Sequence, residues 1–420
     1  MPDDTALPDR DVAGIQRRTV ATLALAQVLG GIAFGATLSI GVLLAAEVSG
    51  DEALAGLATA AVTFGTALLA IPLAALARRR GRRLGLTSGT VIALVGVLLV
   101  IAATSLRAFP LLLVAFALVG GGQAANLQSR FAATDLATDA TRGRALSLVV
   151  WATTIGVVLG PNLVGPGEAV GRALGMPELT GPYVFTVVGQ LLAITVYLAG
   201  LRPDPLLVAQ RVTAARAAAA SGVVRRADRP RAARYAIFAV AAAHAVMVAV
   251  MAMTPVHLLH HGASLQIVGF TISLHVAGMY ALSPVFGILS DRWGRVATIV
   301  LGQALLAAAL VVAATLSGSM PAVTIALILL GLGWSATTVA GSALLTESSA
   351  EARRTRRQGL SDFTMSFVGA VGAILAGLVL GWIGYGGLAL VAMVLVVAAV
   401  ALVPLAVTRA SAPERAAAAD

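Results

Sequence analysis

Long apolar runs constrain this chain more than any other feature of its sequence. Taking roughly 20 residues as one membrane crossing, we count twelve runs separated by polar or charged breaks. They lie near residues 19–46, 53–77, 85–104, 110–133, 145–166, 183–201, 235–258, 265–289, 296–316, 321–346, 359–380 and 386–407. We therefore expect an all-α membrane protein with about twelve transmembrane helices.

The composition agrees with a chain that lies in a bilayer. Hydrophobic residues make up 59% of it and charged residues only 11%, which is far from the balance of an ordinary globular protein. The net charge of +10 comes from arginines between the apolar runs, which membrane topology explains. We therefore expect no nucleic-acid partner. The chain has no cysteine, which excludes disulfides and thiolate metal sites.

The arginines also predict the orientation of the chain. Of the 29 basic residues, all arginine, 27 fall in the N-terminus, the C-terminal tail or every second break, and only Arg107 and Arg172 fall elsewhere. Arginine is retained on the cytoplasmic side of membranes, so both termini are predicted to be cytoplasmic. The polar segment before the first run lacks the apolar core and cleavage site of a secretory signal.

Two halves follow from the same reading. We expect a six-helix bundle at residues 1–201, a cytoplasmic linker at 202–234 and a second six-helix bundle at 235–420. Weak repeats relate the halves: Gly81 and Gly294 follow the second and eighth runs, 213 residues apart, and RGRALS at 142–147 matches RRQGLS at 356–361. Such duplication is typical of secondary transporters. The linker is a solvated tether or a basic amphipathic helix on the inner leaflet.

A burst of charge and glycine follows the eighth run, where residues 287–295 read GILSDRWGR. This spacing resembles the loop motif of the major facilitator superfamily of secondary transporters. The first-half copy, PLAALARRRGRR at 72–83, has Ala74 for the first glycine and Arg78 for the aspartate. The resemblance implies a cytoplasmic gate between the halves, made on one side only by Asp291. The alternative is that these charges only fix topology. The candidate gate residues are Gly287, Asp291, Arg292, Gly294, Arg295, Gly81, Arg82, Arg142 and Arg144.

We expect Asp291 to lie near the N-terminus of the fifth helix. There the helix dipole and Arg142 or Arg144 favour a carboxylate. In that position it would hold the cytoplasmic side closed.

The fifth run carries a glycine and proline pattern that consists of Gly156, Gly160, Pro161 and Gly165. Glycines one turn apart allow close helix packing, and proline removes a backbone donor. The pattern is similar to the antiporter motif of the same superfamily, with Val164 in place of one glycine. It favours export by antiport, and ordinary helix packing is the alternative.

Titratable residues inside apolar runs are candidates for proton coupling, because charge at membrane depth is costly. Asp362 lies one turn into the eleventh run, and it is either a proton carrier or a helix-start residue beside Arg356 and Arg357. His244 and His275 lie near the middle of the seventh and eighth runs and titrate in the physiological range when unperturbed.

Several other side chains are candidates for lining a substrate cavity. Gln123, Asn126 and Arg130 share one face of the fourth helix, where they line the cavity or hydrogen bond to a neighbouring helix. The superfamily's helix-four arginine has no counterpart between residues 116 and 126. Aromatic residues, among them Trp151, Trp334 and Phe363, suit lipophilic compounds or face lipid.

Three further histidines, His257, His260 and His261, cluster at the outer end of the seventh run, with methionines deeper in it. Imidazole and thioether suit copper-like ions, so transition-metal transport is a minor alternative. No carboxylate or cysteine completes such a site, and we predict no resident metal.

Together these features resemble the bacterial proton-coupled drug exporters of the superfamily. The resemblance implies two bundles around a central cavity, alternating access, and export of small lipophilic molecules against protons. The resemblance also implies transport without nucleotide hydrolysis, and the sequence contains no phosphate-binding loop. We expect no enzyme activity and no cofactor, with the proton gradient as the driving force. We expect a monomer in a bacterial plasma membrane. The alternatives are import or uniport of another solute, and a sensor or scaffold without transport.

Overall fold

The structure is a computed structural model, and it describes residues 9–51, 54, 56–219 and 228–407. All regular elements in these ranges are helices. In the first half they are α1 (Asp9–Ser49), α2 (Leu57–Arg80), α3 (Arg82–Ser105), α4 (Phe109–Ala132), α5 (Arg142–Asn162), α6 (Val164–Ala173) and α7 (Tyr183–Gly200), followed by α8 (Pro205–Ala219). In the second half they are α9 (Pro230–His260), α10 (Leu265–Tyr280), α11 (Ser283–Trp293), α12 (Arg295–Thr315), α13 (Met320–Glu347), α14 (Glu351–Ala401) and α15 (Pro404–Val407).

The helices correspond to the predicted apolar runs, with three differences. The eighth run is divided into α10 and α11, and the last two runs form the continuous α14, which has non-helical dihedral angles at Gly384. The fifth run ends at Asn162 rather than 166, and the short α6 follows. Within the described ranges, nine helical segments are long and apolar enough to cross a membrane. The predicted all-α membrane fold is confirmed.

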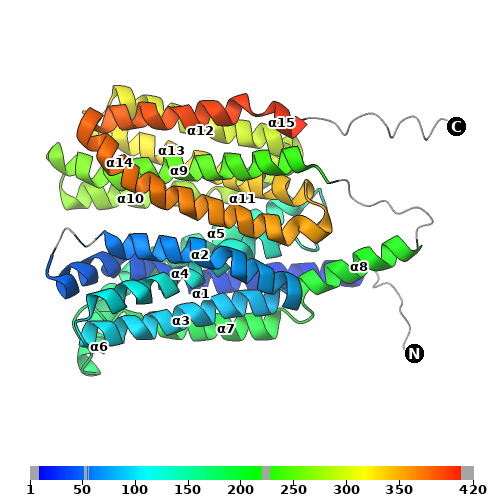
Figure 1. Cartoon of the computed structure of the whole chain (residues 1–420), viewed down its shortest axis with the longest axis horizontal. Coiled ribbons are helices and arrows are strands. Elements are labelled where there is room, and N and C mark those ends of the chain that lie inside the picture. The colour runs from blue at the N-terminus through cyan, green and yellow to red at the C-terminus, as the bar shows by residue number, and fades with distance from the viewer. Residues whose placement is uncertain (1–8, 52–53, 55, 220–227, 408–420) are drawn as a thin grey trace.

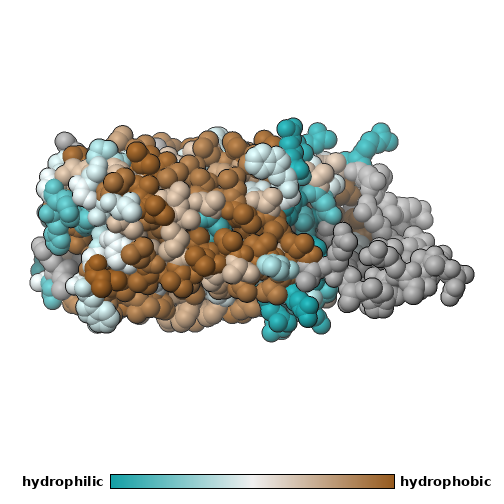
Figure 2. All heavy atoms as spheres, turned by 90° about the horizontal axis from the view of Figure 1, so that it is seen from above, coloured by the Kyte–Doolittle hydropathy of each residue, from teal (hydrophilic) through white to brown (hydrophobic). Residues whose placement is uncertain are grey.

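The helices form two bundles that face each other along their length. In Figure 1, α1–α4, α6 and α7 occupy the lower half, and α9–α14 occupy the upper half. Helix α14 packs on α2, and α11 packs on α5, so these pairs form the junction between the bundles. A band of apolar side chains covers the middle of the molecule, with polar side chains at both ends (Figure 2).

The two bundles repeat the same turn at equivalent places. Gly81 joins α2 to α3 with φ 91° and ψ 166°, and Gly294 joins α11 to α12 with φ 95° and ψ 158°. Both dihedral pairs lie in a region that side chains rarely adopt, so each turn requires glycine. The following arginines repeat as well, because Arg82 pairs with Asp135 after α4 and Arg295 pairs with Glu347 at the end of α13. The sequence repeat at these positions is therefore a structural repeat.

We call the end of the molecule that holds these turns the arginine-rich end. It consists of the α2–α3, α4–α5, α11–α12 and α13–α14 connections together with α8. Two carboxylates fix the connecting segment between α7 and α9 there. Asp204, just before α8, accepts hydrogen bonds from the backbone N–H of Arg83 and from that of Leu206, the second residue of α8. Asp228 accepts from Ala350 and Arg357. The domain limits at 201 and 235 stay a prediction.

Candidate functional site

Asp291, near the end of α11, lies against the first residues of α5 in the other bundle. Its Oδ1 accepts a hydrogen bond from the backbone N–H of Gly143 at 2.8 Å, and its Oδ2 accepts from that of Arg144 at 3.0 Å. A helix N-terminus has unsatisfied N–H groups and a positive dipole end, so it binds a carboxylate well. The Arg144 side chain is 57% exposed and adds a longer ion pair at 3.5 Å.

Arg295 and Glu347 extend this contact across the junction. Arg295 donates to Asp291 and to Glu347 within its own bundle, and to the backbone oxygen of Asp139 in the other. Glu347 also pairs with Arg142 of α5 at 3.1 Å. The side chains of Arg142 and Arg295 are 4% and 8% exposed, so this network is largely shielded from water. Arg292, also predicted to belong to the gate, is exposed.

The first-half loop makes a contact of its own, so the expectation of a gate made on one side only is wrong. Arg82 is fully buried and binds Asp135 through two nitrogens, at 2.8 and 3.0 Å. It also donates to Gln358 of α14 at 2.7 Å, which joins the two bundles. Arg78, which replaces the aspartate of the motif, is exposed.

The replacement of glycine by Ala74 has a structural explanation. In the second half, Gly287 packs on Ser147, and a Cβ at Gly287 would lie 2.7 Å from the Ser147 Cβ. In the first half, Ala74 packs on Gly359, and a Cβ at Gly359 would lie 2.4 Å from the Ala74 Cβ. The glycine is thus supplied by the opposite helix, and the close approach of the bundles is kept on both sides.

A buried ion pair joins the bundles deeper in the molecule. Arg130 of α4 donates through Nη2 to Asp362 Oδ1 of α14 at 2.6 Å, and the two side chains are 3% and 0% exposed. Asp362 Oδ2 and Arg130 Nε are buried and have no hydrogen-bond partner. Arg130 also lies 5.0 Å from the centre of the Phe131 ring. These are the two fully charged residues inside the twelve apolar runs, and the fold pairs them with each other.

The histidine candidates have different surroundings. His244 of α9 accepts a hydrogen bond at Nδ1 from the indole N–H of Trp334 on α13, at 3.0 Å. Tyr280 meets the same indole edge to face, with 5.7 Å between ring centres. His275 is fully buried inside the second bundle, where Nδ1 contacts the Leu327 carbonyl at 2.8 Å. The structure therefore brings His244 and Trp334 together, whereas the His275 side chain contacts the backbone of α13.

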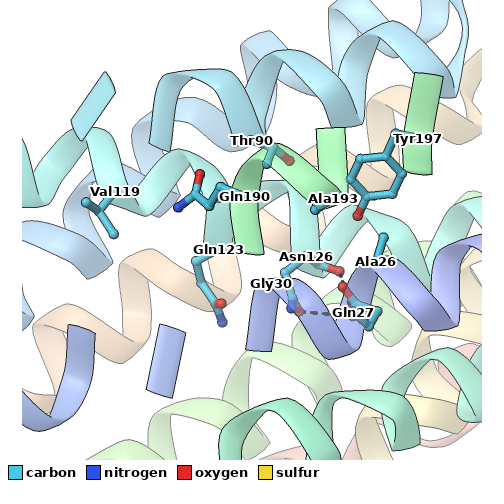
Figure 3. A pocket seen from close by; sticks show the side chains of 11 residues that line it. Ala26, Gln27, Gly30, Thr90, Val119, Gln123, Asn126, Gln190, Ala193 and Tyr197 are labelled. Carbon is cyan, nitrogen blue, oxygen red and sulfur yellow. Dashed lines mark hydrogen bonds between the residues drawn. The ribbon is translucent and has the colours of Figure 1, made fainter. Parts of the chain in front are cut away.

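A small cavity with several polar side chains in its lining lies within the first bundle, between α1, α3, α4 and α7 (Figure 3). Its volume of about 40 Å³ is enough for roughly three water molecules. Gln123 and Asn126 line it, and Gln27 hydrogen bonds to Asn126 and Thr153. The three polar residues of α4 are thus divided, because Arg130 reaches α14 while the other two line this cavity.

The glycines of the fifth-helix pattern also differ. A Cβ at Gly156 would lie 2.4 Å from the Val28 carbonyl oxygen and 2.6 Å from the Gly31 Cα, so α5 and α1 are in backbone contact there. A Cβ at Gly165 would meet nothing within 4 Å. Gly160 and Pro161 lie in α5, but their packing falls outside the described part of the structure. Trp151 is 37% exposed, and Phe363 stacks on Phe367.

The outer histidines form a stacked group rather than an open metal site. His257 stacks on Tyr385 with 4.3 Å between ring centres, and its Nε2 contacts the Ser317 carbonyl at 2.8 Å. The His261 ring lies 4.2 Å from the His257 ring. Among the residues that the structure describes, no three histidine or carboxylate side chains are grouped to hold a metal ion.

Comparison with known proteins identifies the family. The model of the Major Facilitator Superfamily matches residues 23–274 and 236–419, which together cover nearly the whole chain. The chain belongs to the major facilitator superfamily. It is therefore a multi-pass membrane protein of a family of transporters, and the resemblance of its loop at 287–295 is confirmed at this level.

Individual members of the superfamily support the assignment. The uncharacterised MFS-type transporter YddS of Bacillus subtilis is 37% identical over 372 residues, which cover 87% of this chain and 85% of the relative. The riboflavin transporter RfnT of Brucella anthropi is 32% identical over 386 residues, covering 87% and 90%. The human organic anion transporter MFSD10 (TETRAN) has a TM-score of 0.75 at 16% identity, with 92% of this chain and 99% of that chain covered. At that identity the likeness concerns the fold alone.

Proposed function

We propose that this superfamily member is a proton-coupled exporter that works by antiport and alternating access, with small lipophilic molecules as substrates. The observation that supports it most is the buried pair of Arg130 and Asp362 between the two bundles. We assign the proton to Asp362. The driving force is then the proton gradient, with no cofactor and no enzyme activity.

The pair is suited to proton coupling because its energy depends on charge. Two buried charges cost several kcal/mol to desolvate, and their attraction offsets that cost only while both are ionised and in contact. Protonation of Asp362 removes the attraction, so it favours separation of α4 from α14. Asp362 lies on the helix that also carries Gln358, the partner of Arg82. One protonation thus weakens the junction along one face of α14.

We place the arginine-rich end in the cytoplasm of a bacterial cell, because arginine is retained there. All described hydrogen bonds between the bundles, such as those of Asp291 and Arg82, lie toward this end. With that orientation the structure is closed to the cytoplasm. Export requires the same end to open, bind substrate, and close again. The contact of Gly156 with Gly31 lets α5 and α1 cross closely, which supports the antiporter interpretation of the fifth helix.

The test is transport by the full chain in proteoliposomes. Asp362→Asn should abolish substrate transport driven by a proton gradient, while exchange of labelled for unlabelled substrate continues. Uphill transport by this variant at the wild-type rate would remove Asp362 from the coupling mechanism. Proton release on substrate addition, measured with a pH-sensitive dye, separates a transporter from a sensor or scaffold, which would release none. A screen of growth inhibition by toxic compounds, with and without expression of the protein, would identify the substrate.

A second candidate function follows from the riboflavin transporter relative, which is 32% identical over most of both chains. Transport of a planar heterocycle such as a flavin is consistent with the Trp334 and Tyr280 rings in the second bundle. Expression in a riboflavin-requiring bacterial strain tests this. Growth at a riboflavin concentration that does not support the empty-vector strain would establish uptake, and unchanged growth would exclude it.

A further inference from the structure

The guanidinium of Arg130 has more hydrogen-bond donors than the structure uses. An arginine side chain presents five N–H groups. The contacts of Arg130 are made through Nη2, to Asp362 Oδ1 at 2.6 Å and to the Met365 sulfur at 3.9 Å. Nε is buried and has no partner. A buried donor without an acceptor is unfavourable, so this group is available to an acceptor that the chain does not supply.

The surroundings of Arg130 favour an aromatic ligand. Asp362, the partner of Arg130, lies on the helix against which the ring cluster of the second bundle packs. A Cβ at Gly369, about two turns along α14 from Asp362, would lie 2.8 Å from the His244 ring. Trp334 binds His244 through its indole N–H and meets Tyr280 edge to face. The indole N–H is used on His244 Nδ1, so a neutral His244 carries its proton on Nε2 and presents a further donor. The aromatic rings would stack on a planar ligand, and the Arg130 guanidinium and the His244 N–H would bind a negative group on it.

The pair with Asp362 shows how such a ligand would be released. Arg130 and Asp362 belong to different bundles and meet while the arginine-rich ends are in contact. When these ends separate, Arg130 loses its carboxylate and becomes a cation without a protein partner at the opened junction. A substrate carboxylate would take the place of Asp362 in that state. When the ends close, Asp362 returns to Arg130 and displaces the substrate.

We propose that Arg130 is the binding group for a planar aromatic anion, and that Asp362 is the group that displaces this anion as the arginine-rich ends close. The inference rests on the proposed function, since it assigns a substrate class to the same pair of residues. A cationic substrate held by Asp362 is less favoured, because Arg130 would repel it.

Three probes of one shape test the charge preference: 2-naphthoate, 2-naphthalenemethanol and 2-naphthylmethylammonium. Their binding to the purified full chain in nanodiscs would be measured by calorimetry. We expect naphthoate to bind about 10-fold or more tighter than the other two, which is the effect of one charge-assisted hydrogen bond. Arg130→Gln should remove this preference, and Arg130→Lys should keep part of it. Arg172→Gln, which removes an exposed arginine from α6, controls for net charge and should change nothing.

Asp362→Asn decides the role of the carboxylate. Without a competing charge for Arg130, naphthoate should bind this variant about 10-fold tighter than the wild type. Equal binding of the three probes, tighter binding of the ammonium, or weaker naphthoate binding by Asp362→Asn would each overturn the proposal. Uphill transport by Asp362→Asn would instead contradict the proposed proton coupling, so the two failures are distinguishable. Size-exclusion profiles of all variants show whether each is folded.

Discussion

Asp228 illustrates how one carboxylate holds a segment of the arginine-rich end. It accepts hydrogen bonds from the backbone of Ala350 at 2.9 Å and from Arg357 at 2.6 Å, and Arg353 adds a pair at 3.1 Å. Burial alone raises the pKa of Asp228, but the hydrogen bonds and charges of Arg357, Ala350 and Arg353 outweigh it. The pKa of the Asp228 carboxyl is therefore held below its usual range.

This shift predicts a pH-dependent effect on stability. A carboxylate whose pKa is lower in the folded state stabilises that state above its unfolded pKa, and the effect disappears as the pH falls through the folded pKa. Asp228→Asn should lower the melting temperature at pH 7 by about 2 °C, which corresponds to about 1 kcal/mol. The difference from wild type should narrow below about pH 4. Asp11→Asn, at an exposed position, is the control, and a pH-independent difference would contradict this explanation.

Single residues also show what the sequence could and could not predict about the site. Arg130 and Asp362 were each recognisable because no other fully charged residue lies inside the apolar runs. That both are single and opposite in charge is a signal from which their pairing could have been inferred. The contact between Arg82 and Gln358 had no such signal, because a neutral amide 276 residues away carries no charge pattern.

At the scale of helices, hydrophobicity alone predicted the elements well. The runs fixed the spans to within several residues, since burial in lipid requires a certain apolar length. Local breaks inside the apolar runs were missed. The interruption at Ala281 and Leu282 comes just before Pro284, which lies in the first turn of α11, and α5 ends one residue after Pro161. Proline is tolerated in the first turn of a helix and breaks or kinks a helix interior, so these prolines were a local signal that hydrophobicity alone did not use.

The fifth-helix pattern contains two glycines whose replacement by alanine should affect stability to different extents. Gly156→Ala would place a methyl group within 2.4 Å of the α1 backbone, so α1 and α5 must move apart, at a cost of about 1–3 kcal/mol. Gly165→Ala meets open space and should change stability by less than about 0.5 kcal/mol. Thermal melts of the purified variants measure both. Equal melting temperatures of the two variants would show that the backbone contact at Gly156 does not contribute to stability.

At the scale of the whole molecule, the arrangement of the bundles decides which residues at their junction are accessible to solvent. Ser147 of α5 is fully buried at the junction, where its carbonyl accepts a hydrogen bond from Ser283 of α11. It becomes accessible when the arginine-rich ends separate. Thr138, in the α4–α5 connection, is exposed at the same end. The natural chain has no cysteine, so one introduced thiol reports without background.

Maleimide labelling of Ser147→Cys and Thr138→Cys measures this separation. Thr138→Cys should react at once and Ser147→Cys slowly. Adding Asp291→Asn removes the carboxylate from the α5 N-terminus and should speed the labelling of Cys at 147 by about 10-fold, as loss of a charge-assisted hydrogen bond weakens the closed state. An unchanged rate would show that Asp291 does not hold the gate. Applying the reagent to intact cells or to inverted vesicles also shows which side of the membrane the arginine-rich end faces.

The buried contact of Arg130 with Asp362 has a consequence for the resting cell. An antiporter reorients with a proton in one half of its cycle and with substrate in the other, so it leaks protons only if the empty carrier reorients as well. In the empty protein, separating the ionised pair removes the attraction that offsets the desolvation of its two charges, which makes the substrate-free return slow. A cell could therefore hold many copies of the protein in its membrane and keep its proton gradient until a suitable anion arrives.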